Sequence, residues 1–173
     1  IMKNQTNIDC IEITVEHYLN SYHAHPFSIN ALTERFKVIP HGLNLSVGSL
    51  SIDLDYLDKI KKISDQLNTQ YYSDHLCITK SPGIKFSHLT PIHYSKKILK
   101  RVIANVLKIQ EYLGKQLILE NITYPFKLKE SEMTYFDFMA SLVEHTGCGT
   151  LFDVTNFFGN NFKFGEDIDN TVE

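Results

Sequence analysis

Short apolar runs alternate along the chain with longer amphipathic stretches, and the pattern returns about every 30 to 45 residues. The apolar runs have the length of buried strands, and some are rich in β-branched or aromatic residues. They lie at residues 10–14, 36–40, 70–73, 116–119 and 149–152. This alternation predicts an α/β fold with five parallel strands.

The amphipathic stretches between those runs carry the start and stop signals of helices. Asp53 is a candidate N-cap, Thr134 with Asp137 resembles a capping box, and Gly114 is placed to end a helix as its C′ residue. Because a strand follows each helix, we expect right-handed crossovers. The predicted helices span residues 28–35, 53–67, 95–113 and 134–147.

Two architectures share this alternation, the doubly wound open sheet and the (β/α)8 barrel, and spacing alone does not separate them. The sequence has no GxGxxG and no GxxxxGK[ST] loop, which are the phosphate-binding signatures of many doubly wound folds. It also has no linker or low-complexity tract. We therefore predict a single domain over residues 1–173 with barrel-type winding.

Composition narrows the class of protein further. With 43% hydrophobic and 21% charged residues the chain is typical of a globular protein, and no apolar run approaches the roughly 20 residues that span a bilayer. The net charge of -3, without clusters of Lys and Arg, argues against a nucleic-acid partner. The beginning, Ile-Met, indicates that residues upstream have been removed or left out, and because no signal peptide is recognisable we expect a cytoplasmic protein.

The three cysteines, Cys10, Cys77 and Cys148, are odd in number, widely spaced and without a CxxC pair. We therefore predict reduced thiols rather than disulfides or a zinc knuckle. None has a basic neighbour in the sequence that would activate it, so nucleophilic catalysis is not indicated.

Polar residues that could bind a metal ion or take part in catalysis follow the apolar runs. In parallel α/β folds the carboxyl ends of the strands meet at one rim, so these side chains are expected to converge there. Any one of them alone is more simply explained as an N-cap or a hydrogen-bonded core residue, but their recurrence after all five runs favours a metal site. Imidazole and carboxylate ligands without a thiolate suit Fe(II), Mn or Zn, and several carboxylates suit more than one ion. The residues are Glu12, Glu16, His41, Asp74, His75, Glu120, Asn121, Asp153 and Asn156.

The remaining histidines have simpler explanations. His145 lies where a cation complements the C-terminal end of a helix. The loop after the first strand is expected to be solvated, and the segment 78–94 is either a lid or a surface segment. These segments contain His17, His23, His25, His88 and His93. The pair Phe157-Phe158 lines a pocket or, more simply, belongs to the core.

Six ordered motifs resemble those of the multinuclear non-heme iron-dependent oxidases, a bacterial family long described as of unknown function that includes the oxidase of methanobactin biosynthesis. The resemblance covers roughly residues 11–159. The motifs are HGLNLSVGS at 41–49, SDHL at 73–76, LEN at 119–121, SEM at 131–133, TGCG at 146–149 and DVTN at 153–156.

The resemblance implies a TIM-type barrel of the xylose-isomerase-like kind whose rim holds several iron ions. Similar proteins use dioxygen to oxidise cysteine residues of a ribosomally made precursor peptide, often with a partner protein that presents the peptide. It implies no particular catalytic residue. By position, the iron ligands would be His41, His75, Glu120, Asp153 and Asn156, and contacts to those ligands or to substrate would come from Asn121, Asp74 and Glu12.

The sequence departs from the family pattern at four places. Asp74 stands where a Glu is usual, and Thr155 where an Asn is usual. An additional strand before residue 10 and the His-rich segments after Asn156 are not found. We therefore expect a partial barrel of about five βα units, with a preceding strand and the last two strands missing, against about 250 residues for a typical barrel.

Three functions remain open at this point. The first is an iron- and dioxygen-dependent oxidase of peptide cysteines. The second is a non-catalytic module, a truncated or split barrel that associates through its exposed edges. The third is a metal-dependent isomerase or hydrolase with a similar barrel.

Overall fold

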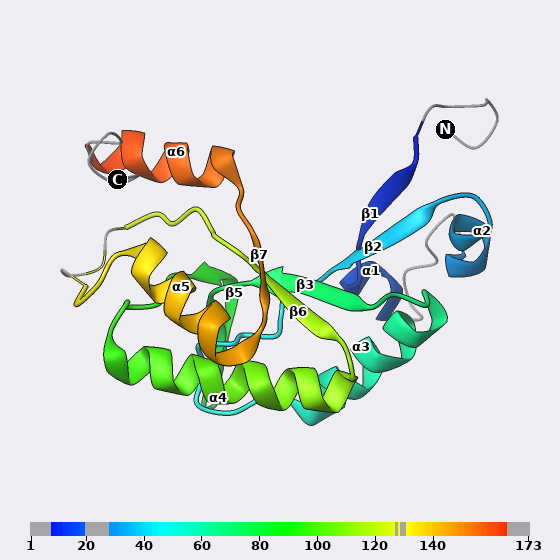
Figure 1. Cartoon of the computed structure of the whole chain (residues 1–173), viewed down its shortest axis with the longest axis horizontal. Helices are drawn as coiled ribbons and strands as arrows, with labels where there is room; N and C mark the ends of the chain where they lie inside the picture. The colour runs from blue at the N-terminus through cyan, green and yellow to red at the C-terminus, as the bar shows by residue number, and fades with distance from the viewer. Residues whose placement is uncertain (1–7, 20–27, 127, 129–130, 166–173) are drawn as a thin grey trace.

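The structure is a computed structural model that describes residues 8–19, 28–126, 128 and 131–165. Its centre is a sheet in the order β1-β2-β3-β6-β7, in which every neighbouring pair is parallel (Figure 1). The strands are β1 (Cys10–Thr14), β2 (Lys37–His41), β3 (Tyr71–His75), β6 (Gln116–Glu120) and β7 (Gly149–Leu151). All five predicted strands are confirmed, with bounds shifted by at most two residues.

The strand order follows the order of the chain without reversal. A doubly wound sheet reverses its order at a switch point, whereas a barrel adds strands in one direction. The observed order therefore agrees with part of a TIM-like fold. Within the described residues the sheet is open, with β1 and β7 at its edges.

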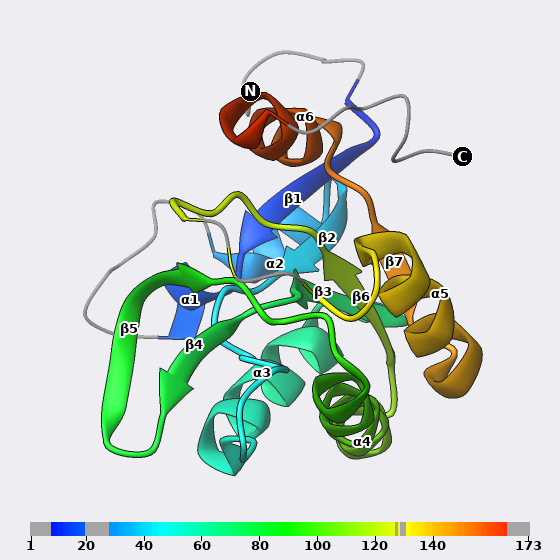
Figure 2. The same cartoon turned by 90° about the vertical axis from the view of Figure 1, so that its left-hand side faces the viewer.

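Three long helices form a layer on one side of this sheet (Figures 1 and 2). They are α3 (Leu54–Gln66), α4 (Lys96–Leu113) and α5 (Tyr135–Thr146), and α4 contacts both of the others. All three were predicted, as was a shorter helix, α2 (Ile29–Thr33). The apolar stripe of each long helix thus packs against the sheet in one shared core.

The predicted caps of these helices are confirmed. The Asp53 carboxylate accepts a hydrogen bond from the Tyr56 N–H at 3.1 Å, and Thr134 with Asp137 forms a complete capping box. Gly114 ends α4 in the left-handed region at φ 65°, which glycine adopts without strain. These local signals determine where the helices begin and end, and hence where the strands that follow them start.

The two faces of the sheet differ because side chains alternate along a strand. On the helix side, Val38, Tyr72, Leu117 and Leu119 are buried in one core with residues of α3, α4 and α5. The opposite face is less covered: Ile39, Tyr71 and Ile118 are half-buried and Glu12 is exposed. It is on this more open face that β2, β3 and β6 each end in a polar side chain.

Four elements were not predicted. Residues 78–94 contain an antiparallel hairpin, β4 (Ile78–Ser81) with β5 (Ile84–Thr90), whose turn includes Gly83 at φ 76° (Figure 2). A short helix, α1 (Glu16–Leu19), follows β1. A longer one, α6 (Val154–Phe164), follows β7 and lies apart from the α3–α5 layer (Figure 1).

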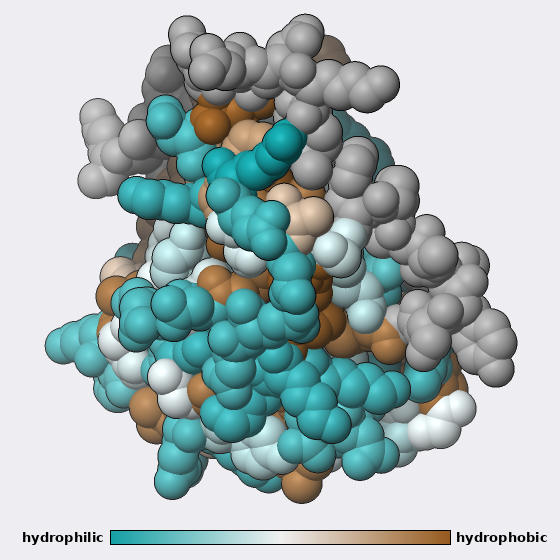
Figure 3. Space-filling view, turned by 90° about the vertical axis from the view of Figure 1, so that its right-hand side faces the viewer, coloured by the Kyte–Doolittle hydropathy of each residue, from teal (hydrophilic) through white to brown (hydrophobic). Residues whose placement is uncertain are grey.

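One face of the molecule is largely polar. Figure 3 shows the side that carries β1 and α2, where hydrophilic residues cover most of the lower part. An exception elsewhere is α6, which exposes Val154, Phe158 and Phe162 at a spacing of four residues, with Phe162 92% exposed. Among the residues that the structure describes, no helix has the length and apolar character needed to cross a membrane.

Candidate metal centre

Three strands end side by side in His41, His75 and Glu120, the last residues of β2, β3 and β6. The parallel register pairs His75 with Glu120 and His41 with Ser73, so alternation along the strands brings all three side chains to one face. All three residues are buried. The structure thus brings together three of the residues that the sequence proposed as ligands.

The facing atoms of this triad lie close together. Nε2 of His41 is 3.4 Å from Oε2 of Glu120, and Nε2 of His75 is 3.7 Å from the same oxygen. The two Nε2 atoms are 3.4 Å apart. In the described part of the chain this is the one group of three or more His, Cys, Asp or Glu residues whose ligand atoms lie within 4.8 Å of one another.

The tautomer of His41 follows from its other ring nitrogen. Nδ1 lies 2.9 Å from the Ser73 hydroxyl oxygen, and that hydroxyl donates its single proton to the Pro40 carbonyl at 2.9 Å. The serine oxygen can then only accept from His41, so the ring proton is on Nδ1. The lone pair of Nε2 therefore points into the triad.

His75 is held in the same tautomer by the backbone. Its Nδ1 lies 3.2 Å from the Gly42 carbonyl oxygen, which has no proton to give, so Nδ1–H donates, and in the neutral ring Nε2 keeps its lone pair. A side chain at position 42 would disturb this contact: a Cβ there would lie 2.0 Å from the Tyr72 hydroxyl and 2.6 Å from a carboxylate oxygen of Asp74. Glycine lets the backbone come this close.

When both rings are neutral, two imidazole lone pairs and a carboxylate oxygen therefore face one another at 3.4 to 3.7 Å. Three electron-rich atoms at this spacing repel one another unless a cation lies between them. Histidines whose second nitrogen donates to a hydroxyl or carbonyl are also typical of metal ligands. The donor set and its tautomers fit a divalent metal ion, with coordination positions left for other ligands.

Burial and the charges around the triad shift the pKa of two of its members. Burial raises the pKa of Glu120, the nearby His75 and His41 lower it, and the negative charges of Asp153 and Glu12 add to the increase. Burial alone lowers the pKa of His75, but the carboxylates of Asp74 and Glu120 outweigh it and the pKa is raised. The site therefore attracts positive charge, whether a proton or a metal ion.

Asp74 supports the triad without facing it. One carboxylate oxygen accepts from the backbone N–H of His75 at 2.7 Å, and the other from that of Leu45 at 3.1 Å. The residue is fully buried. Its carboxylate therefore links the end of β3 to the loop that follows β2.

Asn156 and Asp153 come from the start of α6. The Asn156 amide donates to Oε1 of Glu120 at 3.2 Å and to the Asn121 carbonyl at 2.9 Å. The Asp153 carboxylate instead accepts from the Asn156 backbone N–H at 2.7 Å, as the N-cap of α6. The side chain of Asn121 exchanges two hydrogen bonds with the Asp153 backbone, at 2.9 and 2.7 Å.

The other sequence candidates lie outside the triad. Glu12 is exposed on β1. Glu16 binds the loop after β2, accepting from the Leu43 N–H at 2.7 Å and from the Tyr56 hydroxyl. His145 caps the end of α5 through the Ser141 carbonyl, as expected.

Among the described residues, the remaining histidines and the cysteines add no ligand to the triad. His17 and His88 are exposed, and His23 and His25 lie outside the described residues. The cysteines are unpaired, as predicted. Burial raises the pKa of Cys77 and of Cys148, which keeps these thiols protonated.

Sequence reasoning missed the groups that orient the histidines, Ser73 and the Gly42 carbonyl. Ser73 carried a usable signal, because it precedes His75 by two residues and so lies on the same face of β3. The contact with His41 depends on the register between β2 and β3, which no local pattern reveals.

Comparison with known proteins gives the site its context. The sequence model of a family described as "RiPP precursor modification enzyme MbnB/TglH/ChrH" matches residues 1–173, the whole chain. The chain belongs to this family. RiPP denotes a ribosomally synthesised and post-translationally modified peptide, so the family resemblance seen in the sequence is confirmed.

Three of the relatives carry the name UPF0276 protein. One from Rhizorhabdus wittichii is 31% identical over 161 residues, which cover 92% of this chain and 58% of the relative. One from Acaryochloris marina is 27% identical over 172 residues, with 96% and 60% covered. One from Anaeromyxobacter is 35% identical over 123 residues, with 70% and 43% covered. The chain thus spans about three fifths, or less, of the length of these relatives.

Proposed function

We propose that His41, His75 and Glu120 bind an iron ion, and that the chain contributes this centre to an oxidase of peptide cysteines. The observation that carries the proposal is the arrangement of the two histidines, whose Nδ1 protons are both engaged so that both Nε2 lone pairs face Glu120. Family membership supports a precursor peptide as the substrate.

The three residues would supply two imidazole nitrogens and one carboxylate. This set with open positions is the one used by many non-haem Fe(II) oxygenases. When bound, iron would supply the activation of dioxygen and a binding position for the substrate thiolate. The chain's own residues would orient the ligands: Ser73 and the Gly42 carbonyl fix the two rings, and the Asn156 amide holds the second oxygen of Glu120.

We further propose that Asp153 and Asn156 belong to the same centre, at a second iron. Asn156 already contacts Glu120, and the charge of Asp153 acts on the pKa of Glu120. Ligation by Asp153 would use the carboxylate oxygen that does not cap α6. Asn121 would keep the Asp153 backbone in place. Asp74 would support His75 through the hydrogen bond from its backbone N–H, and Glu12 would act on Glu120 through its charge, without either carboxylate binding iron.

The test begins with protein purified without oxygen and loaded with Fe(II). We expect bound iron by elemental analysis, and loss of most of it in His41→Ala and Glu120→Gln. His145→Ala is the matched control, because that histidine only caps α5, and it should retain wild-type iron. Iron retained in both triad variants would contradict the assignment.

The oxidase activity needs a separate measurement. Iron-loaded protein mixed with a cysteine-containing precursor peptide and dioxygen should consume oxygen and change the mass of the peptide. An unmodified peptide at full iron occupancy would contradict the oxidase proposal while leaving the metal site intact.

A non-catalytic module is the second candidate. It is favoured by the open edges of the described sheet and by the exposed apolar residues Val154, Phe158 and Phe162 on α6. Association through these surfaces would make the protein oligomeric or dependent on a partner. A folded, metal-free protein that forms oligomers in sedimentation experiments, and that takes up no iron, would favour this candidate.

A further inference from the structure

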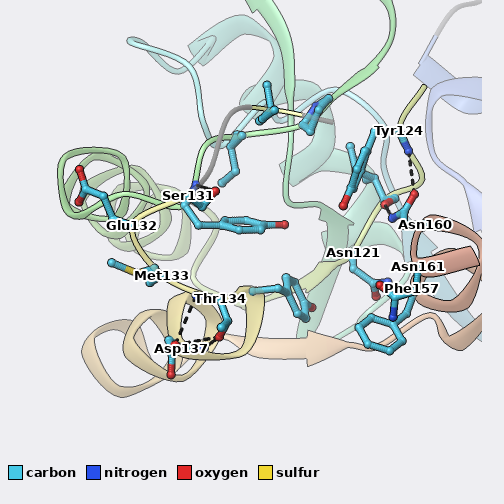
Figure 4. A pocket seen from close by; sticks show the side chains of 16 residues that line it. Asn121, Tyr124, Ser131, Glu132, Met133, Thr134, Asp137, Phe157, Asn160 and Asn161 are labelled. Carbon is cyan, nitrogen blue, oxygen red and sulfur yellow. Dashed lines mark hydrogen bonds between the residues drawn. The ribbon is translucent and has the colours of Figure 1, made fainter. Parts of the chain in front are cut away.

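A cavity of about 660 Å³ lies next to the metal centre, between the loop after β6, the start of α5 and the inner side of α6 (Figure 4). Such a volume is in the range that binds small ligands or short peptide segments. Its floor includes Asn121, the residue that directly follows Glu120. A molecule in the cavity would therefore lie beside the proposed iron site.

Tyr135 connects the cavity to the centre electrostatically. Burial, with a further contribution from the negative charge of Glu120, raises the pKa of Tyr135 to about 12. Its hydroxyl is therefore protonated at neutral pH and is able to donate a hydrogen bond. It lines the cavity together with Tyr94, Tyr124 and Phe157, so much of the wall is aromatic.

The charges of the described lining residues argue against an anionic ligand. None of the described residues that line the cavity is Lys, Arg or His. Its two carboxylates are engaged at helix starts: Glu132 accepts from the Lys96 N–H at 3.0 Å, and Asp137 caps α5 at Thr134. Among the described lining residues nothing compensates the charge of an anion, so this part of the lining fits a neutral group.

Two buried donors in this lining lack a partner among the described residues, the Tyr135 hydroxyl and the Asn161 side-chain N–H group. Asn161 is only 3% exposed. Its neighbour Asn160, in contrast, has both amide atoms paired, with the Tyr124 N–H at 3.2 Å and the Ile122 carbonyl at 2.8 Å. Buried donors without acceptors are costly and uncommon, which points to an acceptor supplied by a ligand.

We propose that this cavity binds an uncharged peptide segment, with a backbone carbonyl accepting from Tyr135 or Asn161 and an apolar side chain against the aromatic wall. This inference rests on the proposed function, since it assigns to the same site a place for residues of the substrate next to the reacting cysteine. Peptide carbonyls match the two unpaired donors, and apolar side chains match the rings of Tyr94, Tyr124 and Phe157.

The test uses the metal-free full chain and the probe N-acetyl-phenylalanine N-methylamide, which carries two amide carbonyls and one ring. We expect saturable binding by calorimetry and ligand-observed NMR. Tyr135→Phe and Asn161→Leu should each weaken binding by about 5- to 10-fold, because each removes one hydrogen bond. Tyr112→Phe, which alters a half-buried tyrosine whose hydroxyl donates to Asp58, should leave the affinity unchanged.

A purely structural role for the two donors gives a different result. Both variants would then bind the probe as the wild type does, and the proposal would be wrong. Absence of binding to the wild type up to the solubility limit, or tighter binding of anionic 3-phenylpropionate than of the probe, would also overturn it. Thermal melting separates these outcomes from misfolding, because removal of an unpaired buried hydroxyl should leave the melting temperature of Tyr135→Phe equal or higher.

Iron content separates this proposal from the proposed function. Both cavity variants should bind as much iron as the wild type, since neither residue is a triad member. Probe binding without iron uptake would refute the metal centre alone, and iron uptake without probe binding would refute the peptide cavity alone.

Discussion

Replacement of Ser73 by alanine is the most informative change outside the triad itself. The Ser73 hydroxyl accepts from Nδ1 of His41 and donates to the Pro40 carbonyl, both at 2.9 Å. Ser73→Ala removes both bonds and leaves a methyl group at a position only 3% exposed. The variant still contains His41, but the His41 ring loses the group that fixes its tautomer and orientation.

Two magnitudes follow from these contacts. A buried ring N–H left without an acceptor lowers the free energy of unfolding by about 1 to 3 kcal/mol. Loss of a group that orients a metal ligand weakens metal affinity by about 10- to 100-fold, which corresponds to about 1.4 to 2.8 kcal/mol of binding free energy. Both effects are large enough to measure in one variant.

Urea unfolding of the metal-free protein, followed by circular dichroism, measures the first effect. Competition for Fe(II) with a chromophoric chelator, without oxygen, measures the second. The matched control is Ser64→Ala, because the Ser64 hydroxyl is also buried but has no partner among the described residues. This variant should leave the Fe(II) affinity unchanged and the free energy of unfolding equal or higher. If Ser73→Ala bound Fe(II) as tightly as Ser64→Ala, His41 would not be oriented by Ser73.

Two further predictions concern the scaffold. Gly42→Ala would place a Cβ 2.0 Å from the Tyr72 hydroxyl, so we expect about 3 kcal/mol or more of destabilisation in urea unfolding; an unchanged midpoint would show that the loop moves aside. Asp53→Ala removes the N-cap of α3 and should cost about 1 kcal/mol at pH 7. The hydrogen bond from the Tyr56 N–H and nearby lysines hold the pKa of Asp53 below its usual 3.8, so the stabilising charge is present above that value. The difference between wild type and variant should shrink as the pH falls through the folded pKa, and a constant difference would contradict the assignment.

The regular part of the fold was predictable because its signals are local. Residues 53–67 and 95–113 combine an apolar stripe with a cap, and the helices formed there differ from the prediction by one residue at each end or less. The hairpin at 78–90 was missed because β4 has only four residues and pairs with β5 across a register shift, and only its Pro-Gly turn marks it. The helix α6 was not predicted although Asp153 and Gly165 cap it, because the sequence explains its Phe157-Phe158 pair as pocket lining or core without a helix.

The candidate site was predictable only in part, for a physical reason. The rule that parallel strands present their ends at one rim indicated His41, His75 and Glu120, and the structure brings their ligand atoms together. The same rule cannot tell a ligand from an N-cap, which is the bond that the Asp153 carboxylate makes here. The tautomers depend on Ser73 across a strand pair and on a backbone carbonyl at Gly42, and both contacts exist only after the sheet has formed.

The proposed function requires that His41, His75 and Glu120 bind one iron ion through Nε2, Nε2 and a carboxylate oxygen. Crystals of protein loaded with Fe(II) without oxygen, measured at the iron absorption edge, test it most directly. We expect an anomalous peak at bonding distance from these three atoms, with both Nδ1 atoms still directed at Ser73 and Gly42. A peak elsewhere, no peak at full iron loading, or coordination through Nδ1 would contradict it.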